Sequence, residues 1–334
     1  MLIARNWNGG IEFTIKLCTH DRVKLKASNE AFYPNFLLKF FISVTHVDLS
    51  SLFDTPKPVI GVIHLLPLPT SPRWGSSLKE VIDRAEQEAT ALAAGGVHGI
   101  IVENFFDAPF TKERVDPAVV SSMSLIVHRV KQMVGIPVGI NVLRNDGHSA
   151  LAIASCVGAK FIRVNVLMGV MATDQGIIEG DAYKLLRYRR ELGSDVKIFA
   201  DVLVKHAQPI SVPQIAAAVH DTVHRGLADA VILSGWATGH APTSEDLKEA
   251  KTACGDTPLL VGSGATWDNV PQLMEYADGV IVSSSLKRNG QIQQAIDPIR
   301  VSRFVDAVRL DIANKKNKHI AEEEIRRSPP VSIG

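Results

Sequence analysis

Charged and amide side chains on two neighbouring predicted strands could bind or transform a polar ligand. Arg163 and Asn165 belong to the predicted strand Phe161–Leu167, and Asp201 belongs to the next one, Val196–Lys205. Because side chains alternate across a strand, Ile198, Ala200, Val202 and Val204 of the second stretch share the outer face. The three polar residues share the inner face, together with Phe199 and Leu203. Two interpretations of Arg163 and Asp201 are open: a structural ion pair, or a carboxylate base beside a guanidinium that binds an anionic substrate.

Polar side chains also end the other predicted strands. The candidate catalytic residues are Asp201, Arg163, His64 and Glu103. The candidate substrate-binding residues are Asn141, Asn165, Lys205, His206 and Ser234. For His64 the alternatives are a hydrogen-bonded structural histidine and an acid–base group. A metal ion could in principle be held by His64, Glu103, Asp201 and His206, but their spacing matches no metal motif, so no metal site is predicted.

Two short loops rich in glycine and serine follow the last two predicted strands. Their candidate phosphate-binding residues are Gly262, Ser263, Gly264, Ser283 and Ser284. Backbone N–H groups in such loops can bind a phosphate at the carboxyl end of a (β/α)8 barrel. The alternative is that these residues only form tight turns. We favour a phosphate site, and both a functional and a relict site agree with the sequence.

Eight apolar stretches alternate with helical patterns and must position these residues. The predicted strands are Val59–Leu65, Gly99–Asn104, Pro137–Leu143, Phe161–Leu167, Val196–Lys205, Ala230–Ser234, Pro258–Gly262 and Gly279–Ser283. Their number predicts an α/β fold, a closed (β/α)8 TIM barrel whose strand carboxyl ends form the site. An open doubly wound sheet is less favoured, because no GxGxxG motif follows the first strand. The long segment Leu167–Gly180 after the fourth strand has the position of a lid.

The ends of the chain differ from this regular middle. Residues 1–46 lean basic and show no clear period, which predicts a poorly ordered extension or a gene start placed too far upstream, with Val47 as an alternative start. Residues 47–314 are the predicted barrel, closed by a helix at Ile299–Asn314, and residues 315–334 are a charged tail.

Composition excludes several classes of protein. The net charge of +1 argues against a general nucleic-acid binder, so no nucleic-acid partner is expected. The 3 cysteines are far apart and form no CxxC pair, which argues against a thiolate metal site or a disulfide framework. No stretch approaches the ~18 consecutive apolar residues of a membrane span, so any membrane contact would be peripheral.

Several long motifs occur in order within about Val47 to Val308: PVIGVIHLLPLPTSPRW, GIIVENFFDAPF, GINVLRND, FIRVNV, ADVLVKHA, LSGWATG and VGSGAT. In sequence and in order they resemble the motifs of the BtpA family, which is known for photosystem I biogenesis. The resemblance implies a TIM barrel and a factor needed for accumulation of photosystem I reaction-centre proteins, located peripherally on the cytoplasmic side of the thylakoid membrane. The implied partners are those proteins or their assembly machinery.

Two functions are therefore open: a photosystem I biogenesis or stability factor, and a lyase, isomerase or nucleosidase acting on a phosphosugar or nucleoside. The inward-facing Arg163, Asn165 and Asp201 favour the enzyme, because a scaffold alone does not need them. The resemblance favours the biogenesis factor, and a fold fixes neither. The resemblance supplies no catalytic residues and no cofactor. The sequence is compatible with a small phosphorylated ligand and with a homo-oligomer.

Overall fold

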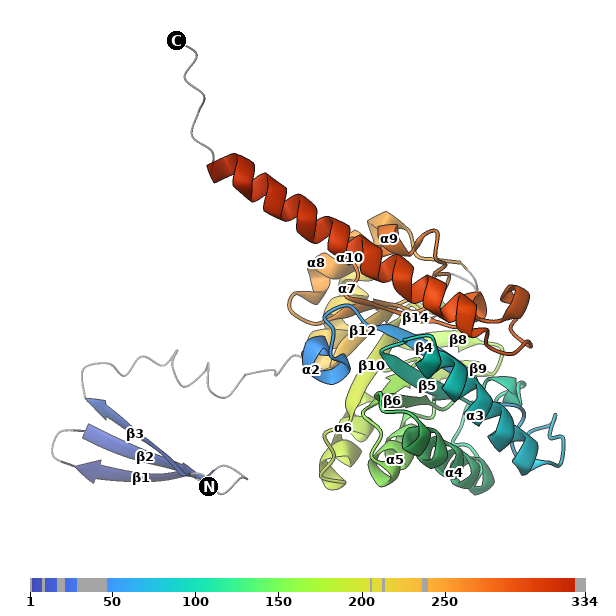
Figure 1. The fold of residues 1–334 in the computed structure, drawn as a ribbon. Coiled ribbons are helices and arrows are strands. Elements are labelled where there is room, and N and C mark those ends of the chain that lie inside the picture. Colours follow the sequence, from blue (N-terminus) through green and yellow to red (C-terminus); the bar gives the residue numbers. More distant parts are fainter. Residues whose placement is uncertain are drawn as a thin grey trace, which may run out of the picture. The chain divides into compact units, whose positions relative to one another are not determined.

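The structure is a computed structural model that divides the chain into two compact units, Met1–Thr45 and His46–Gly334. It describes residues 2–7, 10–16, 22–28, 47–204, 206–211, 214–235 and 240–327, with only the backbone for the first three strands and for 314–327. In the first unit, β1 (Leu2–Trp7), β2 (Gly10–Lys16) and β3 (Arg22–Ser28) pair as an antiparallel sheet (Figure 1). The sequence analysis predicted no strands there, because the segment lacks a clear apolar alternation.

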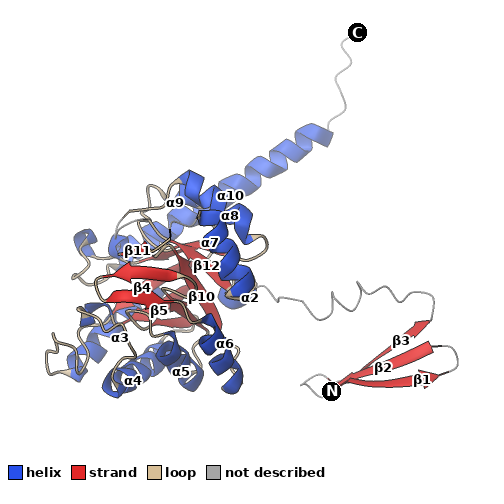
Figure 2. Ribbon diagram, turned by 180° about the vertical axis from the view of Figure 1, so that it is seen from behind, coloured by secondary structure: helices blue, strands red, loops and turns tan. Residues whose placement is uncertain are grey.

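The second unit is built on a closed barrel of parallel strands, with helices around the outside (Figure 2). Its strands, in chain order, are β4 (Val59–His64), β5 (Gly99–Glu103), β6 (Val138–Asn141), β7 (Phe161–Val164), β10 (Lys197–Val202), β12 (Ala230–Leu233), β13 (Leu259–Val261) and β14 (Gly279–Val282). Pairing of Ile281 in β14 with Ile60 in β4 closes the ring. The predicted (β/α)8 barrel is confirmed, and the open doubly wound sheet is excluded.

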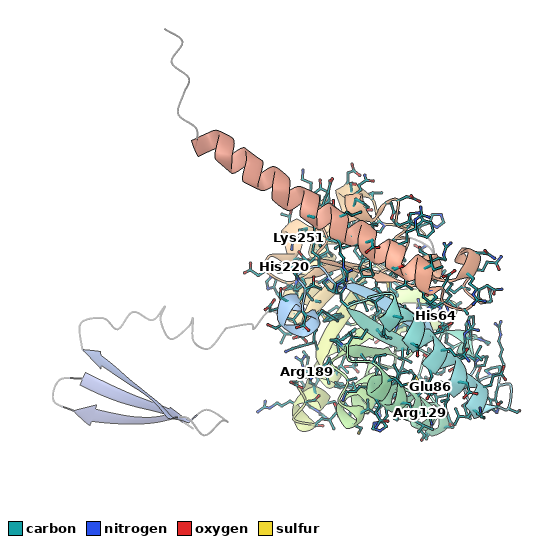
Figure 3. All side chains as sticks on the ribbon, in the orientation of Figure 1. His64, Glu86, Arg129, Arg189, His220 and Lys251 are labelled. Carbon is teal, nitrogen blue, oxygen red and sulfur yellow. The ribbon has the colours of Figure 1, made fainter. Side chains whose placement is uncertain are left out.

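Helices cover the barrel in the expected alternation. They are α3 (Leu78–Ala94), α4 (Pro117–Met133), α5 (Gly147–Val157), α6 (Ala182–Glu191), α7 (Ile215–His220), α8 (Ser244–Cys254), α9 (Val270–Leu273) and α10 (Pro298–Arg327), with a π-helical turn η2 (Asp221–Arg225) after α7. Ion pairs connect neighbouring helices, for example the pair between Arg129 of α4 and Glu86 of α3 (Figure 3). No helix in the described ranges is long and apolar enough to cross a membrane.

The segment before α9 is a loop. The Asn269 side chain accepts from the Thr266 N–H (2.8 Å) and donates to the Gly264 carbonyl (3.0 Å), so the helix begins only at Val270. The closing helix was expected to end at Asn314, but α10 continues to Arg327.

Alternation along the strands separates two hydrophobic cores. Ile198 and Val202 of β10 pack outward in the core that includes helix side chains, as predicted, whereas Phe199 faces the barrel interior. At the amino end of the barrel a short helix, α2 (Leu49–Phe53), lies against this interior, where the ring of Phe53 meets that of Phe161 edge-on at 5.5 Å. The sequence analysis did not predict α2.

The predicted lid segment supplies two strands of a small sheet, β8 (Val170–Thr173) and β9 (Gly176–Glu179). The third strand, β11 (Ala207–Pro209), comes from a later segment and pairs with β8, in the order β11-β8-β9. Met171 and Ile178 are buried with Val166 and Val204 in a separate cluster under this sheet. The segment is therefore an ordered hairpin, and its turn carries Asp174 to the carboxyl end of the barrel, where it lines a pocket.

Candidate functional site

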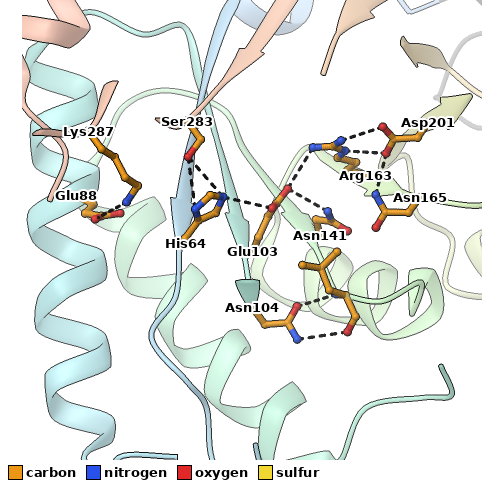
Figure 4. Close-up of polar contacts among 11 residues, drawn as sticks. His64, Glu88, Glu103, Asn104, Asn141, Arg163, Asn165, Asp201, Ser283 and Lys287 are labelled. Carbon is orange, nitrogen blue, oxygen red and sulfur yellow. Dashed lines mark hydrogen bonds and ion pairs between the residues drawn. The ribbon is translucent and has the colours of Figure 1, made fainter. Parts of the chain in front are cut away.

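Arg163 joins two carboxylates inside the carboxyl end of the barrel (Figure 4). Its Nε and Nη2 donate to the two oxygens of Asp201 at 2.8 and 2.9 Å, and its Nη1 donates to Oε1 of Glu103 at 3.3 Å. Burial works against the charged guanidinium, but the adjacent carboxylates of Asp201 and Glu103 outweigh it and raise the pKa of Arg163. Arg163 is therefore a permanent cation that fixes both acids.

Glu103 stands between this ion pair and a histidine. Its Oε1 also accepts from Nδ2 of Asn141 at 3.0 Å, and its Oε2 lies 3.7 Å from Nε2 of His64. The His64 ring stacks on Phe105 with centroids 4.2 Å apart, and the Ser283 hydroxyl lies 3.5 Å from both ring nitrogens. The row His64, Glu103, Arg163, Asp201 thus crosses four strands, β4, β5, β7 and β10.

Two residues at the ends of barrel strands each have a buried polar atom without a hydrogen-bond partner within the described residues. The atoms are Oδ1 of Asn165 and Oγ of Ser234. Nδ2 of Asn165 donates to Asp201 at 2.9 Å, which holds the amide in place while its oxygen remains unpaired. Leaving a buried acceptor unsatisfied costs about 1–3 kcal/mol, so such an atom at a pocket is expected to meet a ligand or water.

A pocket of about 360 Å³ opens over this row. Its lining combines the strand-end polar residues with aromatic and basic side chains. It includes His64, Arg73, Glu103, Phe105, Phe106, Phe110, Asn141, Arg144, Arg163, Asn165, Asp174, His206, Gly262, Ser263, Gly264, Ala265, Ser283, Ser284 and Ser285. Burial lowers the pKa of Arg144, although the nearby Asp201 and Asp174 carboxylates oppose this effect. A volume of this size suits a small metabolite.

The loops after β13 and β14 form one wall of the pocket. Gly264 has a φ of +75°, and a Cβ there would lie 2.1 Å from the Ala241 nitrogen, so only glycine fits. Nε of Arg300 donates to the Ser285 carbonyl at 2.9 Å, and the Ser285 hydroxyl donates to the Ala265 carbonyl, which joins the two loops. In the described part of the chain, the backbone N–H groups of Gly264, Ala265, Ser284 and Ser285 donate to no protein acceptor.

The structure brings most of the predicted site residues together. Of these, eleven line the one pocket: His64, Glu103, Asn141, Arg163, Asn165, His206, Gly262, Ser263, Gly264, Ser283 and Ser284. Asp201 does not line the pocket, because Arg163 covers it and its side chain is 0% exposed. Ser234 lies behind the backbone of Gly262, whose added Cβ would be 2.5 Å from its Oγ. Lys205 lies outside the described residues.

The side chains of His64, Glu103, Asp201 and His206 do not form a group of metal ligands. Among the residues described, no three or more His, Cys, Asp or Glu side chains come together as metal ligands. Arg163 lies between Glu103 and Asp201 and donates hydrogen bonds to both.

Sequence reasoning missed several residues of the pocket. Phe105 and Phe106 lie in the 3-10 turn η1 (Phe105–Asp107) directly after β5, and their position next to a strand-end acid was the available signal. Arg144 follows β6 and also lines the pocket. Arg73 and Asp174 come from loops, and no spacing in the sequence indicates that either of them lies at the barrel mouth.

Comparison with known proteins agrees with these motifs. A profile of the BtpA family matches residues 55–310. The chain is 68% identical over 272 residues to the photosystem I biogenesis protein BtpA of Synechocystis sp., covering 81% of this chain and 95% of that protein. It is 45% identical over 259 residues to an uncharacterized protein of Methanocaldococcus jannaschii, covering 78% and 96%.

A solved structure supports the fold alone. A cube-shaped, porous protein cage, designed by fusing symmetric oligomeric domains, matches with a TM-score of 0.50 at 14% identity, over 81% of this chain and 79% of that chain. The family rests instead on the matched profile and on the identity to curated relatives, each of which shares most of its length with this chain. This chain is a member of the BtpA family.

Proposed function

We propose that this protein is a photosystem I biogenesis factor. The observation that carries the proposal is the 68% identity to the Synechocystis protein of that name, over 95% of its length. Two chains this similar over nearly their whole common length share one fold, and we expect the same cellular role. The barrel by itself does not favour this role, since one fold hosts many functions.

The test is whether this chain can replace the Synechocystis protein in Synechocystis cells. A Synechocystis strain that lacks its biogenesis protein would receive this chain, and photosystem I content would be followed by P700 absorbance and by the amount of reaction-centre protein. We expect photosystem I to return to the level given by the host protein. Normal amounts of this chain without any recovery of photosystem I would contradict the proposal.

We further propose that the protein acts at the cytoplasmic side of the thylakoid membrane as a peripheral protein, in contact with photosystem I reaction-centre proteins or their assembly machinery. The support is the family membership together with the role in the relative's name. A peripheral protein should sediment with thylakoids and be released by alkaline carbonate. Recovery in the soluble fraction alone, under low-salt lysis, would contradict this location.

A second proposal concerns the pocket, which we infer binds a small phosphorylated molecule. The observation that favours it is the lining of the pocket. The N–H groups of Gly264, Ala265, Ser284 and Ser285 donate to no acceptor within the described residues, and the buried Asn165 Oδ1 has no partner among those residues. Backbone N–H groups attract phosphate oxygens, and basic residues of the lining, Arg73 and Arg144 among them, add to that attraction. The phosphate-binding loops of the sequence analysis supply these N–H groups.

Ligand binding can be tested by thermal unfolding of the full chain. Ribose 5-phosphate and glycerol 3-phosphate would be compared with ribose and glycerol, because a ligand of the folded state raises Tm by mass action. We expect a shift only with the phosphorylated compounds. It should be lost in Ser284→Glu, which puts a carboxylate among the donors, and kept in Ser121→Glu on the exposed face of α4. Equal shifts with and without phosphate would contradict a phosphate site.

A further inference from the structure

We propose that Glu103 and His64 form a proton-transfer pair that acts on a carbon next to a carbonyl group, at the inner end of the ligand whose phosphate meets the β13 and β14 loops. The inference rests on the ligand binding proposed above and goes beyond it by naming the reacting groups and the class of substrate. That class is a small phosphorylated ketose or aldose.

Glu103 is fixed by one of its oxygens and open at the other. Arg163 and Asn141 both donate to Oε1, at 3.3 and 3.0 Å, so the carboxylate cannot rotate without losing two hydrogen bonds. Oε2 is directed toward His64 at 3.7 Å, beyond the usual range of a hydrogen bond. An acid with one oxygen anchored and the other directed into a pocket has the geometry of a general base.

His64 stands beside that open oxygen with its ring orientation fixed. Stacking on Phe105 at an interplanar angle of 16° keeps the imidazole plane in place, and Ser283 approaches its nitrogens from β14. Because both His64 and Glu103 line the same pocket, an atom of a bound ligand can meet the imidazole and the carboxylate together. A reaction that removes one proton from a ligand and donates another needs two protein groups of different acidity in contact with that ligand.

The reaction that this pair supports balances without a co-reactant. Oε2 of Glu103 takes the proton from the carbon, the C–H electron pair forms a C=C bond, and the carbonyl π pair moves to oxygen, which takes a proton from Nε2 of His64. The product is an enediol. Return of the Glu103 proton to the neighbouring carbon, and of a hydroxyl proton to His64, gives the isomer.

Asp201 is a positioning residue in this scheme. Its carboxylate is fully buried behind Arg163 and touches neither the pocket nor a ligand in it. Its carboxylate fixes the Arg163 guanidinium, which in turn holds Glu103, and it accepts from the Asn165 amide, whose oxygen has no partner among the described residues. This reassigns the base from Asp201, where the sequence analysis looked for it, to Glu103.

The test follows the exchange of carbon-bound hydrogen for deuterium. The full chain in D2O would be incubated with dihydroxyacetone phosphate, ribulose 5-phosphate and ribose 5-phosphate, and loss of C–H signals would be followed by proton NMR. Binding of each compound would be measured in parallel by thermal shift. We expect exchange with at least one compound, slowed by about 100-fold or more in Glu103→Gln. The matched control Glu113→Gln changes an exposed acid outside this pocket and should exchange like the parent.

The outcomes separate the two proposals. Exchange that is lost in Glu103→Gln and in His64→Gln, while both variants still bind the ligand, supports the proton-transfer pair. Binding without exchange in the parent overturns the pair and leaves the ligand site in place. Neither binding nor exchange overturns the ligand site and the pair together. Unchanged exchange in Glu103→Gln removes Glu103 as the base, and circular dichroism of each variant confirms that it is folded.

Discussion

His98 holds a structural hydrogen bond that depends on its protonation state. Nδ1 accepts from the Val59 N–H at 3.0 Å, so the ring must be unprotonated at that nitrogen. Burial, and then the charge of Arg309, lower the pKa of His98 below its ordinary value of 6.5. The His98 ring therefore binds a proton more readily in the unfolded chain than in the folded one. The stability that neutral His98 contributes is present above pH 6.5 and is lost as the pH falls through the lowered pKa of the folded state.

We expect the free energy of unfolding to decrease from pH 7.5 to pH 5, and His98→Gln to lessen that decrease because glutamine keeps an acceptor but does not titrate. Urea unfolding at a series of pH values measures it. The matched control His128→Gln removes an exposed histidine of α4. An identical pH dependence in His98→Gln and in the parent would show that His98 contributes nothing to it.

For individual site residues, strand alternation predicts which face of the sheet a side chain occupies, but not which neighbours it contacts. It placed Arg163, Asn165 and Asp201 on the inner face, where the structure has them. It could not tell that Arg163 would cover Asp201, since that depends on side-chain length and on the acid of a third strand, Glu103. The distinction between an acid that meets the pocket and an acid that supports another residue is therefore visible only in three dimensions.

At the scale of elements, a buried ion pair joins α3 to the turn after β14. Nζ of Lys287 donates to Oε1 of Glu88 at 2.9 Å, with the two side chains 0% and 1% exposed, and Arg84 donates to the same oxygen at 2.8 Å. Burial lowers the pKa of Lys287, while Glu88 opposes this shift. The lysine follows Ser283–Ser285 in the chain, so the pair also anchors a wall of the pocket.

Lys287→Met should lower the free energy of unfolding by about 1–3 kcal/mol, because it removes one of the two charged donors to the buried Glu88 carboxylate and leaves Arg84 as the other. The double variant Lys287→Met with Glu88→Leu should recover most of that loss, since it removes both charges from the interior. Chemical denaturation of the two single variants and the double variant gives the coupling. Additive losses would contradict a direct interaction.

Elements with their own periodicity were predictable, and elements that depend on distant partners were not. All eight barrel strands were found because each is a short apolar stretch between turn signals. β8 and β9 were read as a loop, because β8 gains its other neighbour only from β11, a segment about thirty residues away in sequence. The short α2 was missed because its helical form depends on Phe53 packing against the barrel interior.

At the scale of the whole molecule, the chain divides at Thr45 and His46 into two compact units. We expect a protein comprising residues 47–334 to unfold with the same Tm as the full chain, because the core residues that the structure describes belong to the second unit. Differential scanning calorimetry of both proteins measures this. A clearly lower Tm for residues 47–334 would show that the first unit contributes to barrel stability.

The aromatic packing at the amino end of the barrel has a kinetic consequence. Phe161 and Phe199 stack at 4.7 Å, and Phe53 of α2 lies against both rings, so side chains fill the interior below the polar row. A molecule bound at Glu103 would therefore enter and leave at the carboxyl end, which is lined by the β8–β9 turn and by the loops after β4, β5, β13 and β14 among others. A loop that partly covers this end without contacting the molecule would slow association and dissociation by the same factor. Occupancy at equilibrium would stay constant while residence time lengthens.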